Sequence, residues 1–362
     1  MENLVNMRLV DINFWKNKKV FITGHTGFKG SWLSIWLMEM GAILKGYSLE
    51  PNTDPNLFEL ANVSNGMDSE IGDIADYENL KNSMESFSPD IILHLAAQPL
   101  VRDSYEDPLL TYKINVMGTA NLLEVSRHLK DLKSIVIVTT DKCYENKEWE
   151  WGYREYEPMG GYDPYSSSKG CVELITSAFR RSFFNSTNIA LASARAGNVI
   201  GGGDWSKDRL IPDILRSYNL GNKVIIRNPL ATRPWQHVIE PLSGYLVLAE
   251  NLFIKGNEFA EPFNFGPKDE DCQSVESILN LINKNWNSCP GWSLDKLANP
   301  HESKFLKLDI SKSKNRLDWT PRWNLEVAIK RIVDWNTAYL NSENMREYCI
   351  NEIKSYLNYE RS

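Results

Sequence analysis

A tyrosine and a lysine stand four residues apart in the segment Tyr165-Ser166-Ser167-Ser168-Lys169. If this segment is helical, the spacing places the phenol and the ammonium on one face. A nearby ammonium lowers the pKa of a phenol, so Tyr165 could act as a base near neutral pH. The pattern arises often by chance, so its value depends on what the rest of the chain places beside it.

Three further reactive groups follow the apolar run 134–140, which predicts a strand. In open parallel sheets, ligands bind at the carboxyl ends of the strands. Thr140 offers a hydroxyl there. Asp141 is a candidate acid if its pKa is raised, and Lys142 is a candidate base if its amine is neutral. The alternative is a surface ion pair between Asp141 and Lys142 on a loop.

A glycine-rich turn holds Gly24, Gly27 and Gly30 between a predicted strand at 19–23 and a predicted helix at 31–40. Side chains at these positions would block the close approach of a phosphate pair. The helix N-terminus adds N–H groups and a partial positive charge. The spacing is G-x-x-G-x-x-G, not the G-x-G-x-x-G of ordinary dehydrogenases. We predict a dinucleotide site here, with a plain structural turn as the alternative.

The residues after the second predicted strand bear on the choice between NAD and NADP. An acid at its end would accept hydrogen bonds from a ribose 2′-hydroxyl, but Ser48 stands there and Glu50 follows two residues later. The segment 48–51 also has no cation for a 2′-phosphate, so NAD is favoured. Asp73 is placed to bind an adenine amine, and a turn role is its alternative.

Strands and helices alternate along the first half of the chain. Apolar runs predict further strands at 42–49, 90–97 and 188–194, and helical periods occur at 115–129 and 165–184. This alternation predicts an α/β fold with a Rossmann-type, doubly wound parallel sheet. We assign it to residues 1–195, with a return segment near 231–254 that contains a helix at 241–253. Residues 196–362, less that segment, are expected to form a smaller mixed lobe that binds substrate.

Composition excludes several classes of protein. The 362 residues are 42% hydrophobic and 24% charged, which is typical of globular chains. A net charge of −7 disfavours a nucleic-acid partner. The five cysteines are widely spaced, so we expect free thiols and no metal site. With no signal-like N-terminus and no run of apolar residues long enough for a membrane, we expect a cytoplasmic protein.

Taken in order, the motifs resemble the extended short-chain dehydrogenase/reductase family from about residue 16 to 340. They are the glycine turn, the segments 94–98 and 115–119, Thr140, and the Tyr165/Lys169 pair. The segments 233–238 and 308–312 match the nucleotide-sugar-modifying branch of that family.

Within this branch, the segment 140–146 is similar to the 4,6-dehydratases, and in particular to those that act on CDP-glucose. Members acting on dTDP-glucose or GDP-mannose would carry Glu where this chain has Lys142. The resemblance implies removal of water from CDP-glucose on NAD. Tyr165 would deprotonate the C4 hydroxyl, Lys142 would take the C5 proton, and Asp141 would protonate the C6 hydroxyl.

Alternative functions remain open. The chain could be another nucleotide-sugar 4,6-dehydratase or a 4-epimerase. It could also be a catalytically silent scaffold that senses NAD, although Tyr165 and Lys169 are both present.

The resemblance also implies binding residues. The cofactor set adds Thr26, Phe28, Ser48, Asp73, Ile74, Leu95, Ala96, Ala97 and Asn115 to the glycines, Tyr165 and Lys169. The substrate set is Gln98, Asn198, Arg209, Leu210, Arg233 and Asn264. Ser303 departs from the pattern, because dTDP-type relatives would have an arginine there.

Two apolar helical segments suggest self-association. The regions 105–129 and 165–184 carry Leu109, Leu110, Val172, Phe179 and Phe183. Related enzymes pair the equivalent helices across a two-fold axis, so we predict a homodimer or a dimer of dimers. The resemblance further implies a place in deoxysugar synthesis for a surface polysaccharide such as lipopolysaccharide O-antigen.

Overall fold

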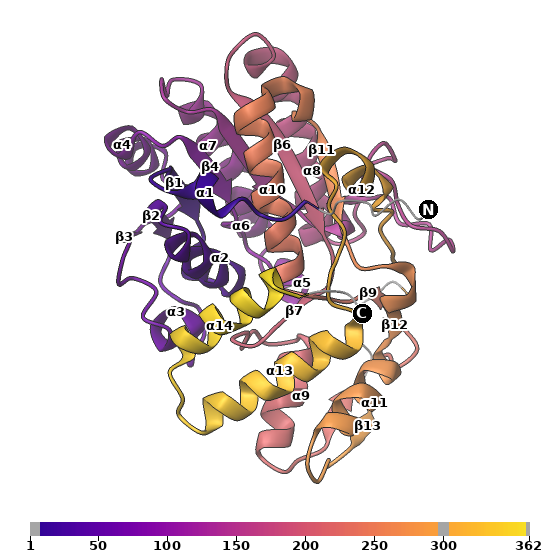
Figure 1. The fold of residues 1–362 in the computed structure, drawn as a ribbon. Coiled ribbons are helices and arrows are strands. Elements are labelled where there is room, and N and C mark those ends of the chain that lie inside the picture. Colours follow the sequence, from indigo (N-terminus) through magenta and orange to yellow (C-terminus); the bar gives the residue numbers. More distant parts are fainter. Residues whose placement is uncertain (1–7, 296–303, 360–362) are drawn as a thin grey trace, which may run out of the picture.

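The computed structural model describes residues 8–295 and 304–359 and is built around a seven-stranded parallel sheet. The strand order is β11-β6-β5-β4-β1-β2-β3 (Figure 1). The strands are β1 (Lys19–Thr23), β2 (Ile43–Ser48), β3 (Asp68–Ile71), β4 (Ile91–His94), β5 (Ser134–Val138), β6 (Ala190–Ala196) and β11 (Pro262–Phe265). This arrangement confirms the Rossmann-type doubly wound sheet.

Helices cover both faces of the sheet. One face carries α2 (Phe28–Glu39), α10 (Ile239–Lys255) and α14 (Met345–Leu357), and the other carries α4 (Tyr77–Phe87), α7 (Gly118–Ser126) and α8 (Pro164–Phe179). Shorter helices are α1 (Ile12–Trp15), α3 (Leu57–Leu60), α5 (Val101–Glu106), α6 (Pro108–Tyr112) and α12 (Ser311–Leu317). Single π-helical turns at Lys113–Met117 and Arg180–Phe184 flank α7 and α8.

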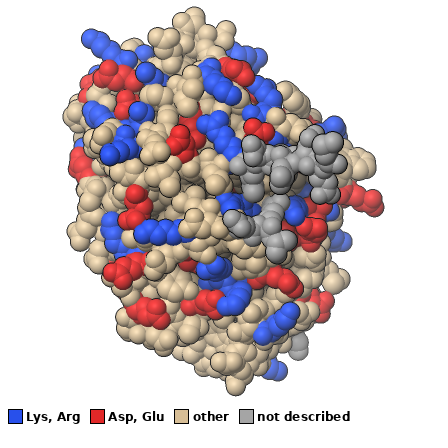
Figure 2. Space-filling model, viewed as in Figure 1, with Lys and Arg blue, Asp and Glu red and all other residues tan. Residues whose placement is uncertain are grey.

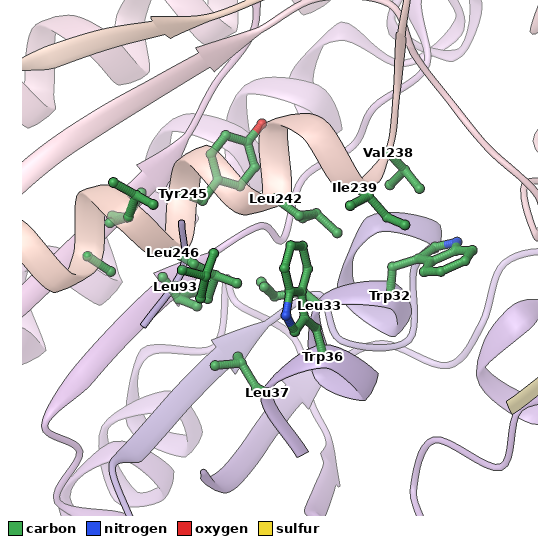
Figure 3. Packing of buried hydrophobic residues seen from close by; sticks show 14 of the residues in the cluster. Trp32, Leu33, Trp36, Leu37, Leu93, Val238, Ile239, Leu242, Tyr245 and Leu246 are labelled. Atoms are coloured by element: carbon green, nitrogen blue, oxygen red, sulfur yellow. The ribbon is translucent and has the colours of Figure 1, made fainter. Parts of the chain in front are cut away.

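Successive residues of each strand direct their side chains to opposite faces of the sheet. Ile22 and Leu93 belong to the apolar cluster under α2 and α10, whereas Phe21 and Ile92 belong to the cluster under α4, α7 and α8. This alternation follows from the two-residue repeat of a strand. Figure 3 shows Trp32, Leu33 and Trp36 of α2 directed at residues of α10. Helix α2 is buried around most of its circumference, which fixes its N-terminus in space.

The second lobe lies at the carboxyl edge of the sheet (Figure 1). It contains α9 (Leu210–Asn219), α11 (Val275–Asn285) and α13 (Leu325–Leu340), which share one apolar cluster. Its short strands are β7 (Val199–Ile200), β8 (Val224–Ile226), β9 (Thr232–Pro234), β10 (Gln236–His237), β12 (Cys272–Ser274) and β13 (Trp292–Leu294). The division of the chain at residue 195 stays a prediction.

Several sequence expectations need correction. Strand β3 was not predicted, because its residues Asp68, Ser69 and Glu70 are polar and it lies at the sheet edge. Strand β11 was missed as well, although it pairs with β6. Val172, expected to lie on an association surface, is 1% exposed and packs in the core.

The surface charges, the lengths of the helices and the state of the cysteines agree with the composition. On the face shown in Figure 2, acidic and basic side chains are interspersed among the described residues. Within residues 8–295 and 304–359, no helix combines the length and apolarity needed to cross a bilayer. All five cysteines carry free thiols.

A buried carboxyl group sits where α14 meets the second lobe. Glu352 is 2% exposed, and its carboxyl oxygens have no hydrogen-bond partner among the described residues. Arg331 and His237 approach these oxygens only to 3.9 Å. Burial raises the pKa of Glu352 to about 8, despite the opposing charge of Arg331. Burial also lowers the pKa of His237 to about 3, so this imidazole is neutral.

This burial makes stability depend on pH in a defined direction. The folded protein holds a proton on Glu352 that the unfolded chain loses above about pH 4.5. Stability from this group is therefore present at acidic pH and is lost as pH rises towards 8. Glu352→Gln mimics the protonated form. At pH 8 it should raise the free energy of unfolding by about 2 kcal/mol or more, with little effect at pH 5.

Urea denaturation at pH 5, 7 and 8 measures this difference. Glu347→Gln, on the exposed side of the same helix, is the matched control and should change stability little at each pH. Equal stabilities of wild type and Glu352→Gln at pH 8 would contradict the prediction.

Candidate active site

A cavity of about 930 Å³ opens between the carboxyl edge of the sheet and the second lobe. It brings together groups that are far apart in the sequence. Of the predicted catalytic and substrate-binding residues, its lining includes Thr140, Asp141, Lys142, Tyr165, Asn198, Arg209, Leu210 and Arg233. The carboxyl edge is where an open α/β sheet places its ligands.

The glycine turn is packed so closely that two of its positions exclude any side chain. Gly24 has φ +77°, and a Cβ there would lie 2.8 Å from the backbone nitrogen of Ala96. A Cβ on Gly30 would lie 2.0 Å from the carbonyl oxygen of Gly24. Gly27 caps α2, which begins at Phe28, so the first N–H groups of this helix stand beside the turn. Such a cradle fits a diphosphate.

Side chains at the end of β2 fasten this turn. The Thr26 hydroxyl donates to the carbonyl oxygen of Leu49 at 2.8 Å and lies 2.8 Å from the Ser48 hydroxyl. Glu50 is exposed. The carboxylate of Asp73 accepts from the backbone N–H of Ala75 at 2.8 Å, which is a turn contact. Adenine binding by Asp73 stays a prediction.

The loop after β4 is held by buried hydrogen bonds. The backbone N–H groups of Leu95 and Ala96 both donate to the Thr23 hydroxyl at 3.1 Å, and Ala97 follows them, half-buried. The amide of Asn115 bonds to the backbone of Gln98 and to the Ser168 hydroxyl.

Asn115 therefore links this loop to α8. Its side-chain amide already bonds to protein atoms. Ile74 packs beside Gly118 of α7 and is 5% exposed. Both belong to the predicted cofactor set, and their part in it stays a prediction.

The loop after β5 presents Asp141 to the cavity in an unusual environment. The Thr140 hydroxyl donates to one carboxylate oxygen at 2.9 Å. The other oxygen is buried without a hydrogen-bond partner among the described residues. A Cβ on Gly197 would lie 2.0 Å from it, so this glycine makes room for the carboxylate. Burial raises the pKa of Asp141, the direction that an acid requires.

The predicted effect of Lys169 on Tyr165 is wrong for the protein alone. Burial raises the pKa of Tyr165 to about 12, while a hydrogen bond with Thr140 and the charge of Arg209 oppose the rise. Lys169 is not among the main influences on the phenol, because burial lowers the pKa of Lys169 itself to about 8. Helical spacing shows which groups are neighbours but not how strongly water is excluded from them.

The second lobe supplies cations to the cavity. Arg209 donates to the buried carboxylate of Asp204 at 2.9 Å, and its side chain is 33% exposed. Arg233 is 5% exposed and donates to the carbonyl oxygen of Thr232 at 2.9 Å. Asn198 lines the same wall with φ +23°, and Leu210 begins α9 beside Arg209.

Two residues of the predicted substrate set lie outside the lining of the cavity. Asn264 is fully buried, and its amide bonds to Tyr144, Tyr153 and the carbonyl oxygen of Asp309. Gln98 directs its amide at Leu100 and Thr111. Protein atoms engage both side chains, and their part in substrate binding stays a prediction. Ser303 falls outside the described residues.

The sequence analysis missed cationic groups in the cavity. Lys29, at the start of α2, lies in the lining with Asp141. Burial lowers the pKa of Lys29 to about 7, helped by the charges of Arg209 and Lys169. Arg102 and Arg227 approach one carboxylate oxygen of Asp208 at 3.4 and 3.5 Å. A lysine inside a glycine-rich turn was the available clue for Lys29.

Comparisons with known proteins agree with this geometry. The sequence profile of the GDP-mannose 4,6 dehydratase family matches residues 21–260. The CDP-glucose 4,6-dehydratase of Salmonella typhimurium is 56% identical over 354 residues, covering 96% of this chain and 99% of that enzyme. The dTDP-glucose 4,6-dehydratase of Xanthomonas campestris is 24% identical, over 87% of this chain and 92% of its own length.

Solved structures share the fold. The dTDP-glucose 4,6-dehydratase from Bacillus anthracis, determined in complex with NAD, superimposes with a TM-score of 0.75 at 21% identity, covering 91% of this chain and 99% of its own. The epimerase Mth375 from Methanothermobacter thermautotrophicus gives a TM-score of 0.77 at 20% identity, with coverages of 94% and 98%.

The close approach at Gly30 generates a prediction. Gly30→Ala should destabilise the protein by about 3 kcal/mol, because the added carbon would overlap backbone that cannot move freely. Gly27→Ala is the matched control, since a Cβ there would meet the Gly24 carbonyl oxygen at an ordinary 3.4 Å. It should cost less than about 1 kcal/mol. Urea denaturation compares them, and equal losses would refute the steric argument.

Proposed function

The chain belongs to the GDP-mannose 4,6-dehydratase family, and on that premise we propose that it removes water from CDP-glucose to give CDP-4-dehydro-6-deoxy-glucose. The meeting of Thr140, Asp141, Lys142 and Tyr165 in one cavity carries this proposal. The high identity to a CDP-glucose 4,6-dehydratase along nearly the whole chain supports this substrate.

NAD is the proposed cofactor, and the glycine turn fits its diphosphate because Cβ atoms would fill the space at Gly24 and Gly30. Ser48 and the exposed Glu50 favour it over NADP, since a 2′-phosphate would meet no cation in the segment 48–51. When bound, NAD would supply a hydride acceptor for C4 of the sugar and then a hydride donor for C6.

Tyr165 and Thr140 serve the first step. Tyr165 accepts the proton of the C4 hydroxyl, and Thr140 hydrogen-bonds the same oxygen. The Thr140 hydroxyl lies close enough to the phenol to oppose the rise in the pKa of Tyr165. Because Tyr165 starts with a raised pKa, it needs positive charge close by to act as a base, and Arg209 contributes part of that charge.

The elimination step needs a neutral acid and a neutral amine. Asp141 protonates the departing C6 hydroxyl, and burial raises its pKa, which is the direction that this role requires. Lys142 is the proposed base for the C5 proton. Lys29 is a second amine in the same cavity, and its pKa of about 7 makes it a rival for this role.

Arg209 and Arg233 are proposed to bind the diphosphate, with Asn198 and Leu210 beside them. A guanidinium can donate two parallel hydrogen bonds to phosphate oxygens. Arg209 is paired with Asp204 in the structure, so it would share or exchange this partner when a diphosphate arrives.

Two broader proposals concern the setting of the enzyme. Free cysteines support a reducing cytoplasm as its location. The product carries a 4-ketone, which further enzymes of deoxysugar synthesis can reduce or aminate, and we place it on the route to a surface polysaccharide such as O-antigen. Deletion of the gene should remove a deoxysugar from that polysaccharide.

A panel of CDP-, dTDP-, UDP- and GDP-sugars with NAD or NADP tests the activity directly. CDP-glucose with NAD should give a 4-keto sugar that absorbs in alkali, and Tyr165→Phe should abolish the absorbance. Turnover of another nucleotide sugar would indicate a different dehydratase. An isomeric hexose would indicate an epimerase, and no turnover at all would indicate a scaffold.

Return of the hydride within one active site gives a second prediction. CDP-glucose labelled with deuterium at C4 should yield product labelled at C6, as read by mass spectrometry or NMR. Label that accumulates in free NADH, or that is lost to solvent, would show an ordinary dehydrogenase instead.

The two lysines can be separated by mutation. Lys142→Ala should retain C4 oxidation but lose elimination by at least about 100-fold, as expected for loss of a general base. Lys29→Met should slow elimination less than about 10-fold. Stopped-flow absorbance of bound NADH and chemical quench measure the two steps. Full turnover in Lys142→Ala would contradict the assignment of Lys142 as the base. Loss of elimination in Lys29→Met would identify Lys29 as the base instead.

Self-association is proposed through the exposed apolar side chains of the segment 105–117 and α8. Leu109 is 80% exposed, Leu110 45%, Met117 55% and Leu174 60%. Such a group of apolar side chains is typical of a protein interface. We expect a homodimer or a dimer of dimers by light scattering at micromolar concentration, and a monomeric mass would refute this.

A further inference from the structure

The loop that carries Thr140, Asp141 and Lys142 is tied down at both of its ends. Before the loop, the Thr139 hydroxyl donates to Glu173 Oε1 at 2.5 Å. After the loop, the Tyr144 hydroxyl accepts from Arg195 Nη1 at 2.7 Å and donates to Asn264 at 2.7 Å. Thr139 and Tyr144 thus bond to two charged residues, Glu173 and Arg195.

Glu173 and Arg195 form a buried ion pair beneath this loop. Arg195 Nη2 lies 2.8 Å from Glu173 Oε2, and each side chain is 4% exposed. Ser193 donates a further hydrogen bond to Glu173 Oε2 at 2.7 Å. Neither charged side chain is part of the cavity lining. The pair therefore lies behind the reacting groups and does not touch the substrate.

The ion pair also reaches the helix that carries the other catalytic side chains. Tyr165, Lys169 and Glu173 follow one another at four-residue intervals along α8, so they lie on one face. Arg195 is in β6, which pairs with β5 up to Val138 and receives the Thr139 N–H at Ala194. One ion pair thus connects the loop 140–143, helix α8 and strand β6.

We infer that Glu173 and Arg195 are positioning residues that hold the loop 140–143 in register with Tyr165 and Lys169. This inference rests on the proposed function, because dehydration uses both sets on one sugar. Tyr165 must meet the C4 oxygen while Asp141 and the base meet C6 and C5. Small displacements between such groups cost large factors in rate.

The charge of Glu173 has a second, electrostatic effect. It opposes the lowering of the Lys169 pKa by burial. Removal of this charge should let the pKa of Lys169 fall further, so that the ammonium loses its proton at a lower pH.

A purely structural ion pair would behave differently. Loss of a buried partner destabilises a protein wherever it lies. It would then reduce both chemical steps by one common factor through a smaller folded fraction. Positioning instead predicts an unequal effect on oxidation and elimination.

Thr139→Val tests the anchor without unbalancing charge. Hydrogen exchange followed by mass spectrometry, without substrate, should show amides of 139–144 exchanging at least 10-fold faster. In single turnovers with CDP-glucose, elimination should slow at least 10-fold and C4 oxidation less than 3-fold. Glu173→Gln should in addition move the alkaline limb of the pH–rate profile to lower pH.

Two further variants keep the test decisive. If Glu173→Gln does not fold, Glu173→Met with Arg195→Met removes both charges and should show the same faster exchange and unequal rates. Glu250→Gln is the control, because this buried carboxylate bonds to Trp15 and Arg8 far from the loop. It should lower stability and leave exchange at 139–144 and the ratio of the two rates unchanged.

The inference is overturned if Thr139→Val and the charge variants exchange at wild-type rates in 139–144, or if both chemical steps slow by one common factor. Wild-type protein that does not turn over CDP-glucose would overturn the proposed function instead. The exchange measurement would still decide whether the ion pair holds the loop.

Discussion

Exclusion of water from the carboxyl edge of the sheet is the constraint on which the chemistry of this protein depends. Burial is the largest cause of every pKa shift described in the cavity, and each shift favours the uncharged form. Among the lining residues the pKa of Asp141 is raised and that of Lys29 falls to about 7, and behind them on α8 the pKa of Lys169 falls to about 8. A neutral carboxylic acid and a neutral amine are what an elimination needs, so one physical effect prepares both partners.

The same effect works against Tyr165, whose pKa rises to about 12. A desolvated phenol becomes a base only if positive charge compensates for the lost water. The chain supplies such charge from Arg209 across the cavity. Oxidation at C4 is therefore sensitive to the cations around the site.

The fold was predictable because its signals are local. Apolar runs and the glycine turn identified β1, β2, β4, β5 and β6, together with the helix after the turn. Strand β3 was not predictable from apolar character, since Asp68 and Glu70 form an edge strand that bonds to Lys45. Residue types located Asp141 and Tyr165, but burial and distant pairing decide their properties. That is why Lys29 was missed, and why the bonds of Asn264 to Tyr144 and Tyr153 were not foreseen.

The proposal of an amine rather than a carboxylate as base agrees with the same constraint. In a cavity that favours neutral forms, a carboxylate tends to keep its proton and becomes a weaker candidate to remove one. An amine loses its proton under the same pressure and becomes available. Lys29 in the cavity lining shows this effect, because burial lowers its pKa to about 7. A glutamate among these lining residues would need more water or more positive charge around it to lose its proton.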